Sequence, residues 1–488
     1  MKKHFDFIII GAGIIGSMIA RFLSQYHADI LLIEKESDIG MGASSANTAI
    51  IHAGHDPDPR TLKAKLNLMG NKMWGNIADE LGIPFSRTGS YVVAIGNEEF
   101  KHLQPLYENG KKNGVPGIKI VKRDFILKAE PLLNPDVKGA ILTPSAGIID
   151  PFTATLAVCE NAVRNGVNLM LETEFVDFIL KDNKIVGIQT NKGTFTSRWI
   201  INCAGIYSDE VMHKAGIRTE FKIIPRRGEY MIFDRSKITL NSVFFPVPIK
   251  ETKGILVTTT THGNVIIGPN ADVINNKEDK STTHQGEDYV FNNAKKMFPS
   301  LDLKHVISQF SGIRATGNNL DRDFIIEIPE KIKGLINLGG IDSPGFASAP
   351  AIADNVVNLL KESGEKLLPK INWKAQNPAK KCFRELSYKQ RATLIKNNSA
   401  YGNIICRCEN ITEGEILDAI HSIIPARTYD AVKRRTWLGT GRCQGSFDYP
   451  KVINILAKEL KVPLTDINKK GKGSEFLFRQ TKDLETNS

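Results

Sequence analysis

Residues 5–34 begin with an apolar run, FDFIII, that leads directly into the turn Gly11-Ala12-Gly13-Ile14-Ile15-Gly16. Helical apolar spacing follows to about Tyr26, and a second apolar run, ILLIE, ends at Glu34. In such a unit the first glycine permits a tight turn, the second lets a pyrophosphate approach, and the third lets helix and strand pack closely. The helix N-terminus attracts phosphates, and the terminal acid suits a ribose diol. We therefore expect an α/β fold with a Rossmann-type dinucleotide-binding domain.

The size and composition of the chain favour a multidomain globular protein. Its 488 residues suffice for two to four domains, and 41% hydrophobic with 24% charged residues is ordinary for such proteins. The apolar stretch 7–20 contains three glycines and is too short to span a bilayer. Six cysteines do not make a disulfide framework in a chain of this length. We expect a cytoplasmic protein.

The positive charge is concentrated at the C-terminal end. Residues 369–488 contain 22 Lys and Arg against 12 Asp and Glu, a net charge of +10 out of +11 for the whole chain. This asymmetry suits an acidic partner protein, peripheral contact with an anionic membrane, or simply a soluble basic domain. No interleaved aromatic pattern supports nucleic-acid binding, so we expect none.

The segment after the acid resembles a known family. KESDIGMGASSANTAIIHAG, from Lys35, resembles the flavin-contacting stretch of the FAD-dependent oxidoreductases related to D-amino-acid oxidase. Its continuation, HAGHDPDPRTLKAKLNLMGNKMW, resembles the glycerol-3-phosphate oxidase and dehydrogenase branch, although Arg60 stands where relatives often have glycine. The resemblance recurs in PRRGEYMIFD, TKGILVTTTTHGNVIIGPN, FSGIRA and LGGIDSPGFASAPAIA, and so spans about residues 1–368. It implies FAD as the cofactor.

The resemblance also implies where FAD would be held. Two runs of small residues, in WIINCAG and in LGGIDSPG, let backbone approach a cofactor closely. The expected contacts are Gly11, Gly13, Ile14, Ile15, Gly16, Glu34, Lys35, Ser44, Ser45, His52, Val176, Ala204, Gly205, Gly340, Ile341, Gly345 and Phe346.

The chain order predicts interleaved domains. An FAD-binding domain is expected from residues 1–90, 145–215 and 325–368, and a mixed-sheet α+β substrate domain from 91–144 and 216–324. A linker (369–400), a small, mainly helical module (401–460) and a basic tail (461–488) would follow.

His52 is the expected catalytic base. A histidine at a strand end is often only structural, but flavin oxidation of an alcohol needs a group that accepts the hydroxyl proton. The resemblance places His52 there, and the small residues Ala53 and Gly54 leave room for the flavin ring and substrate. His55 is interpreted as structural or solvated.

An anionic substrate needs fixed cations. By resemblance, Arg314 lies over the substrate, Lys253 lies near it with a catalytic role, and Ser343 faces the same site. Each of the three could instead be an ordinary surface or turn residue. Arg226, Arg227 and Arg322 are further candidates for phosphate binding that spacing alone does not place.

The last quarter contains a cysteine pattern. Cys406-x-Cys408, a gap of 34 residues and Cys443 resemble a [2Fe-2S] module related to bacterioferritin-associated ferredoxin, in which a fourth cysteine follows after four residues. Here that position is Asp448. Three interpretations stay open: Asp448 ligates a cluster, the four residues bind zinc, or the module is a metal-free docking domain. Thr412 and Glu415 predict a capping box. The other cysteines, Cys159, Cys203 and Cys382, are expected to be inert.

Together these features predict FAD-dependent oxidation of sn-glycerol 3-phosphate to dihydroxyacetone phosphate. An L-2-hydroxy acid such as 2-hydroxyglutarate is the alternative substrate. A flavin-containing electron-transfer or docking subunit is the alternative of another class. Oxygen, a quinone or a partner protein would accept the electrons.

Overall fold

The computed structural model describes residues 2–216, 221–248 and 254–479, in two compact units. The first unit comprises residues 1–33 and 40–377, and the second comprises 34–39 and 378–488. Each unit is described by itself. No helix in the described ranges is both long and apolar enough to span a membrane.

The first sheet contains the predicted dinucleotide-binding unit. Its order is β10-β11-β12-β1-β2-β9, and β20 lies beside β12 and pairs with β19. The strands β20, β12, β1, β2 and β9 are parallel along this path, whereas β10, β11 and β19 pair antiparallel. The bounds are β1 His4–Ile10, β2 Ile30–Ile33, β9 Asn168–Met170, β10 Phe175–Lys181, β11 Lys184–Thr190, β12 Gly193–Asn202, β19 Ile325–Glu327 and β20 Leu335–Gly339.

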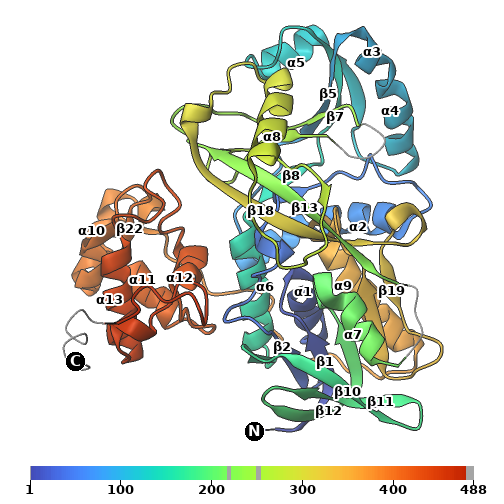
Figure 1. Ribbon diagram of the computed structural model, residues 1–488, viewed down its shortest axis with the longest axis vertical. Helices are drawn as coiled ribbons and strands as arrows, with labels where there is room; N and C mark the ends of the chain where they lie inside the picture. The colour runs from blue at the N-terminus through green and yellow to red at the C-terminus, as the bar shows by residue number, and fades with distance from the viewer. Residues whose placement is uncertain (1, 217–220, 249–253, 480–488) are drawn as a thin grey trace, which may run out of the picture. The chain divides into compact units, whose positions relative to one another are not determined.

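Helices cover the first sheet because its central strands are apolar on both faces. α1 (Ile14–Leu23) follows β1 and packs against α6 (Pro151–Arg164) and α9 (Gly345–Glu362) (Figure 1). α7 (Ser208–Lys214) adds Val211 and Met212 to a core with Ile8, Ile200 and Leu335. α1 ends three residues before the predicted Tyr26.

The second sheet is mixed and lies in the same unit. Its order is β17-β13-β16-β15-β14-β5-β7-β6, with β18 paired along β13. Most neighbours are antiparallel, but β14 and β5 are parallel. The bounds are β5 Ser90–Ile95, β6 Lys119–Lys122, β7 Val137–Thr143, β13 Ile223–Phe233, β14 Val243–Pro246, β15 Leu256–Thr259, β16 Val265–Gly268, β17 Asp272–Val273 and β18 Val306–Gly317.

The two faces of the second sheet have different neighbours. One face packs on α5 (Arg123–Ala129) and α8 (His284–Met297), with Phe233 and Phe244 in the shared core. The alternate residues, including Phe245, join a core with Ile50 and Ile148 of a small third sheet. That sheet consists of β3 Ile50–Ile51, β8 Gly147–Ile149 and β4 Phe85–Ser86. The second sheet therefore packs against the strand that leads into His52.

The remaining helices of the first unit are α2 (Leu62–Leu81), α3 (Gly96–Lys101) and α4 (Leu103–Lys112). The side chain of Thr61 caps α2 by accepting from Ala64 N. The fold confirms the expected class: a Rossmann-type domain and a mixed-sheet domain, followed by a mainly helical module.

The second unit is a small helical module. It contains α10 (Tyr388–Asn397), α11 (Glu413–Ile420), α12 (Tyr429–Thr436), α13 (Tyr449–Leu460) and the two-stranded ribbon β21 (Ile404–Cys406) and β22 (Ile411–Thr412) (Figure 1). The capping box of α11, Thr412 with Glu415, is confirmed. Residues expected in a basic tail instead contribute Ile467 and Phe476 to the module's core.

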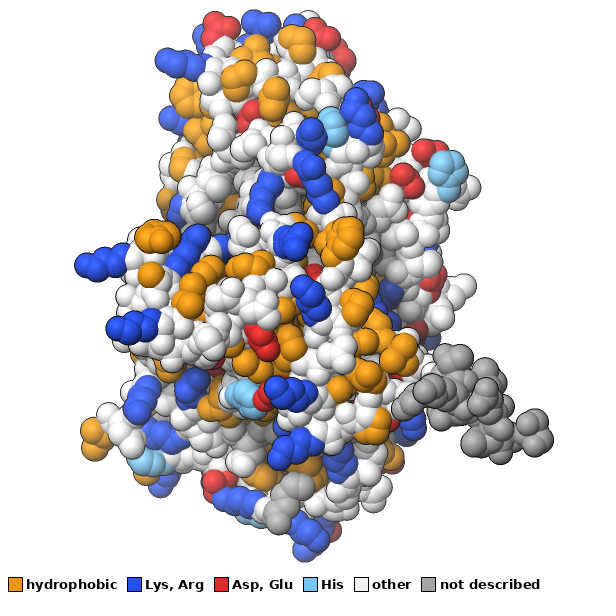
Figure 2. Space-filling model, turned by 90° about the vertical axis from the view of Figure 1, so that its left-hand side faces the viewer, with side chains coloured by type: hydrophobic (Ala, Val, Ile, Leu, Met, Phe, Trp, Pro, Cys, Tyr) orange, Lys and Arg blue, Asp and Glu red, His pale blue; other side chains and the backbone are white. Residues whose placement is uncertain are grey.

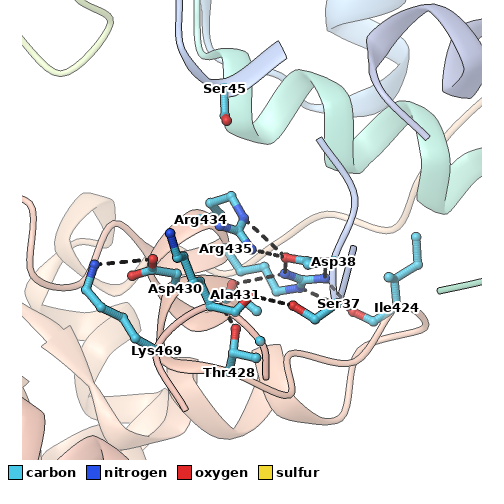
Figure 3. A network of polar contacts seen from close by, with 12 residues as sticks. Ser37, Asp38, Ser45, Ile424, Thr428, Asp430, Ala431, Arg434, Arg435 and Lys469 are labelled. Carbon is cyan, nitrogen blue, oxygen red and sulfur yellow. Dashed lines mark hydrogen bonds and ion pairs between the residues drawn. The ribbon is translucent and has the colours of Figure 1, made fainter. Parts of the chain in front are cut away.

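The segment Glu34–Ile39 belongs to this second unit, which its sequence position directly after β2 does not indicate. Asp38 is only 1% exposed and accepts hydrogen bonds from Arg434 (Nη2, 2.7 Å) and Arg435 (Nη1, 2.8 Å; Nη2, 2.9 Å) of α12 (Figure 3). Burial opposes ionisation of Asp38, but the two guanidinium groups outweigh it and lower the pKa to about 2. A buried carboxylate with two cationic partners thus holds the segment in the module.

We expect Arg435→Ala to destabilise the module by about 3–5 kcal/mol, because removing one partner leaves a buried charge poorly compensated. Hydrogen exchange across α12 and α13 at neutral pH measures the loss. Arg60→Ala is the matched control, since Arg60 pairs with Asp58 at an exposed site. Equal exchange rates in the wild type and Arg435→Ala would contradict the assignment.

The ion cluster of Asp38, Arg434 and Arg435 predicts that acid destabilises the module. The folded pKa of Asp38 lies below its unfolded value of about 3.9, so its stabilisation is complete above that value. It is lost as the pH falls towards 2, and amounts to about 2.6 kcal/mol. Comparing hydrogen exchange of Asp38→Asn with that of the wild type from pH 6 to pH 3 checks it: the difference should shrink as the pH falls.

Candidate active site

The expected cofactor residues follow the carboxyl ends of parallel strands. β1 leads into Gly11, β2 into Glu34, β12 into Ala204 and Gly205, and β20 into Gly340 and Ile341. Gly11 N donates to Ile33 O (2.8 Å) and Cys203 N to Ile10 O (2.9 Å), which aligns the ends of β1, β2 and β12. The carboxyl edge of such a sheet is where open α/β folds bind ligands.

Two glycines are required by close packing at this edge. A Cβ on Gly16 would lie 1.9 Å from Gly11 O, so α1 approaches the turn as only glycine permits. Gly11 has φ of +101°, and a Cβ there would lie 2.5 Å from Cys203 O. The motif is therefore built as the dinucleotide fingerprint requires.

The N-terminus of α1 is suited to an anion. Its cap, Gly13, offers no side-chain hydrogen bond, and the first turn contains no acid. Ser44 Oγ accepts from Ile14 N (2.9 Å), which places the short helix Ala43–Ser45 beside this turn. The glycine-lined turn, the polar helix end and the neighbouring serine fit the pyrophosphate of FAD.

The other expected FAD contacts are more dispersed. Gly345 and Phe346 begin α9, and Trp74 stacks on Phe346 with ring centroids 5.7 Å apart. Val176 lies in β10, in the antiparallel part of the sheet, and is 47% exposed. Their contact with FAD stays a prediction.

His52 follows β3 and its ring packs against Phe245, with centroids 5.7 Å apart. Phe245 belongs to β14, so this ring contact joins the third sheet to the second. Asn71 Nδ2 donates to His52 O (3.0 Å) and to Ser145 O (2.9 Å), which fixes the backbone at the strand end. His52 is partly exposed, whereas His55 is buried, as expected for a structural residue.

Arg314 lies on β18 between Gly312 and Thr316, which contact segments expected to bind FAD or substrate. Gly312, Arg314 and Thr316 share one face of the strand. A Cβ on Gly312 would lie 2.1 Å from Ala46 O, and Thr316 Oγ1 donates to Asp342 Oδ2 (3.0 Å). Arg314 Nη2 also donates to Asn270 O (2.8 Å). The guanidinium is therefore braced and lies on the face turned towards the expected flavin-binding segments.

Arg314 is not the only cation here. Arg226 lies directly opposite it in the β13–β18 register. Burial and the charges of Arg314 and Arg322 lower the pKa of Arg226, so the three guanidinium groups influence one another electrostatically. The Asp342 carboxylate opposes part of this effect, and a bound anion would offset more of the positive charge.

Ser343 is exposed and adjoins a buried ion pair. Lys63 Nζ lies 2.6 Å from Asp342 Oδ1, with both side chains almost buried. This pair ties α2 to the loop after β20. Lys253 lies outside the described residues. Sequence reasoning missed Asp342, Lys63 and Asn71. The partners of these side chains lie far away in the chain, so no local sequence pattern marks the contacts.

The cysteine cluster is assembled in the module. Cys408 Sγ and Cys443 Sγ are 3.5 Å apart. Burial raises the pKa of Cys406 to about 12 and also raises that of Cys408. Asp448 is 1% exposed, and its Oδ1 accepts from the hydroxyl of Tyr429 (2.6 Å). Burial raises the pKa of Asp448, while Tyr429 and the Cys406 thiol oppose that rise.

The remaining cysteines are separate from this cluster. Burial raises the pKa of Cys203 and Cys382, which disfavours the reactive thiolate form. Cys159 is fully buried within α6.

Comparisons with known proteins agree with this architecture. The family model described as FAD dependent oxidoreductase matches residues 6–359, and the model of a BFD-like [2Fe-2S] binding domain matches residues 404–458. The chain is 45% identical to a glycerol 3-phosphate dehydrogenase of Caloramator mitchellensis, over 98% of this chain and 99% of the relative. It is 34% identical to a glycerol 3-phosphate oxidase of Mycoplasma genitalium, over 75% of this chain and 97% of the relative.

A solved structure shows the same fold. The dithionite-reduced L-alpha-glycerophosphate oxidase of Mycoplasma pneumoniae with FAD bound is similar with a TM-score of 0.73 and 31% identity, over 78% of this chain and all of that one. Together with the glycine-lined edge of the first sheet, these matches show that the chain belongs to the family of FAD-dependent oxidoreductases.

Proposed function

We propose that this protein oxidises sn-glycerol 3-phosphate to dihydroxyacetone phosphate, with FAD as the hydride acceptor. The group of Arg226, Arg314 and Arg322 carries the proposal, because three mutually repelling guanidinium groups suit a phosphate dianion. The relatives that act on glycerol 3-phosphate by name support the same substrate.

His52 is the proposed base. FAD, when bound, supplies the acceptor for the hydride from C2 of the substrate. The His52 imidazole would take the C2 hydroxyl proton, which leaves the ketone of the product. Asn71 fixes the backbone of His52, and Phe245 packs beside its ring, so both contacts restrict where the imidazole can lie.

Arg314 would bind the phosphate, and Arg226 would assist it from the neighbouring strand. The hydrogen bond from Arg314 to Asn270 O restricts the guanidinium before substrate arrives, which reduces the entropy lost on binding. Ser343, exposed beside Asp342, would donate to a substrate oxygen, and Lys253 would add charge near the substrate.

The electron acceptor would be oxygen, a quinone or a partner protein. On the face drawn in Figure 2, Lys and Arg side chains are scattered among hydrophobic and neutral ones and do not merge into one patch.

An anaerobic titration of the FAD-loaded protein with glycerol 3-phosphate tests the function. Stoichiometric loss of the oxidised flavin absorbance supports it, and admitting air then shows whether oxygen is the acceptor. If only an L-2-hydroxy acid such as 2-hydroxyglutarate bleaches the flavin, that acid and not glycerol 3-phosphate is the substrate. No bleaching by either would favour an electron-transfer or docking subunit.

His52→Ala should lower the rate of flavin reduction by glycerol 3-phosphate about 10²- to 10⁴-fold, because the proton acceptor is lost. FAD content should stay unchanged. Anaerobic stopped-flow absorbance measures the rate. His284→Ala, at an exposed position of α8, is the matched control and should reduce at the wild-type rate. Unchanged reduction in His52→Ala would remove His52 from the mechanism.

Arg226→Ala should reduce the preference of the enzyme for glycerol 3-phosphate over glycerol. We expect kcat/KM for glycerol 3-phosphate to fall about 10- to 100-fold, the loss of a charge-assisted contact, with little change for glycerol. Parallel steady-state assays with both substrates measure the ratio, and exposed Arg123→Ala is the control. An equal fall for both substrates would indicate a structural defect and contradict a phosphate contact.

A further inference from the structure

The segment Glu34–Ile39 contains the acid expected to bind the ribose of FAD, yet it belongs to the second unit. We propose that Arg435 of α12, assisted by Arg434, is a positioning residue for FAD: by binding Asp38 it holds the segment in the conformation in which Glu34 meets the ribose. FAD binding and the ordering of the module then favour each other. The proposal concerns the cofactor and goes beyond the substrate chemistry proposed above.

Both ends of the segment are fixed at the glycine turn that follows β1. Before the segment, Ile33 O accepts from Gly11 N (2.8 Å). After it, Gly40 N donates to Ala12 O (3.1 Å), and Gly40 has φ of +67°, a conformation that favours glycine. Residues 34–39, all of which the structure describes, form neither helix nor strand. The ladder of a helix or sheet therefore does not set the course of this segment, and side-chain contacts have to do so.

The module supplies those contacts. Ser37 Oγ donates to Lys470 O (2.7 Å). Asp38 Oδ2 accepts from Arg434 Nη2 (2.7 Å) and Arg435 Nη1 (2.8 Å), and Oδ1 accepts from Arg435 Nη2 (2.9 Å) (Figure 3). Arg435 thus binds the carboxylate through two parallel hydrogen bonds, which fix the direction of the side chain as well as its distance.

Arg435 is itself held by the module. Its Nε and Nη2 donate to Ile424 O (3.2 and 3.0 Å), and its Nη1 donates to Ala431 O (2.9 Å). The side chain is only 4% exposed. A guanidinium bound in this way does not follow Asp38 when the segment moves, so the fold of the module decides where Asp38 lies.

The position of Asp38 bears on Glu34, which lies four residues earlier in the same segment. Glu34 Oε1 accepts from Glu36 N (3.1 Å), so the carboxylate is folded onto the segment and moves with it. A segment released from the arginines exchanges among several conformations, and only a fraction of the molecules then presents Glu34 to the ribose. The apparent Kd for FAD rises as that fraction falls. By linkage, bound FAD stabilises the contacts of Asp38 by the same factor.

The affinity for FAD is measured on the full-length protein after removal of its flavin, by titration with FAD and flavin fluorescence. Arg435→Ala should raise the Kd about tenfold, within the usual range for two coupled sites. Thr412→Ala is the matched control, because it removes the capping box of α11 and weakens the module at another helix. It should bind FAD as tightly as the wild type. An equal rise in both variants would show that only the stability of the module matters, and would overturn the positioning role.

A double-mutant cycle tests whether Arg435 acts through Glu34. Glu34→Gln keeps the size of the side chain but replaces the carboxylate with a weaker acceptor, and should raise the Kd by itself. Adding Arg435→Ala to Glu34→Gln should then raise the Kd much less than Arg435→Ala does in the wild type, because the acid that it positions is already lost. If the two effects simply multiply, Arg435 acts elsewhere and the proposal is wrong.

Hydrogen exchange tests the reciprocal effect without deleting an arginine. Adding FAD to the flavin-free wild type should slow exchange in α12, since linkage requires FAD to stabilise the Asp38 contacts. Asp38→Asn, which keeps the volume of the side chain, should show less of this protection. Identical exchange of wild-type α12 with and without FAD would overturn the coupling. None of these measurements uses a substrate or an electron acceptor, so this proposal and the proposed function fail separately.

Discussion

The close approach of backbone to backbone at the carboxyl edge of the first sheet is the constraint on which the flavin half depends. Gly16 lets α1 reach the turn, because any Cβ would overlap Gly11 O. Gly11 in turn lets β12 close against the same turn at Cys203 O. A larger residue at either position would separate α1 from the sheet. The cofactor edge, α1 and the packing of α6 and α9 on that helix all follow from these two contacts.

Much of the flavin half could be predicted from the sequence, because the patterns that indicate it lie within short stretches of the chain. The glycine turn, the flanking apolar runs and the capping box of α11 each lie within a few tens of residues, and each is present as predicted. Helix and strand ends were less well predicted, since α1 ends at Leu23 rather than near Tyr26. The last turn of a helix is decided by packing that local periodicity does not encode.

The residues that brace the candidate substrate site could not be predicted in the same way. Arg226 and Arg314 become neighbours only through the register of β13 with β18. Lys63 and Asp342 are separated by 279 positions, and nothing local in either segment marks the ion pair. The resemblance could nominate Arg314, but the cations and acids around it depend on long-range pairing of strands.

The buried ion cluster of Asp38 gives the module a structural role that is independent of any metal. The segment Glu34–Ile39 begins with the acid expected to bind the ribose and is held in the module by two arginines of α12. Without those arginines Asp38 would be a buried charge lacking compensation, so the segment and α12 stabilise each other. The same helix leads into the loop that carries Cys443. These hydrogen bonds involve the arginines of α12 and none of the module's cysteines, so the contact of the segment with α12 does not depend on a bound metal.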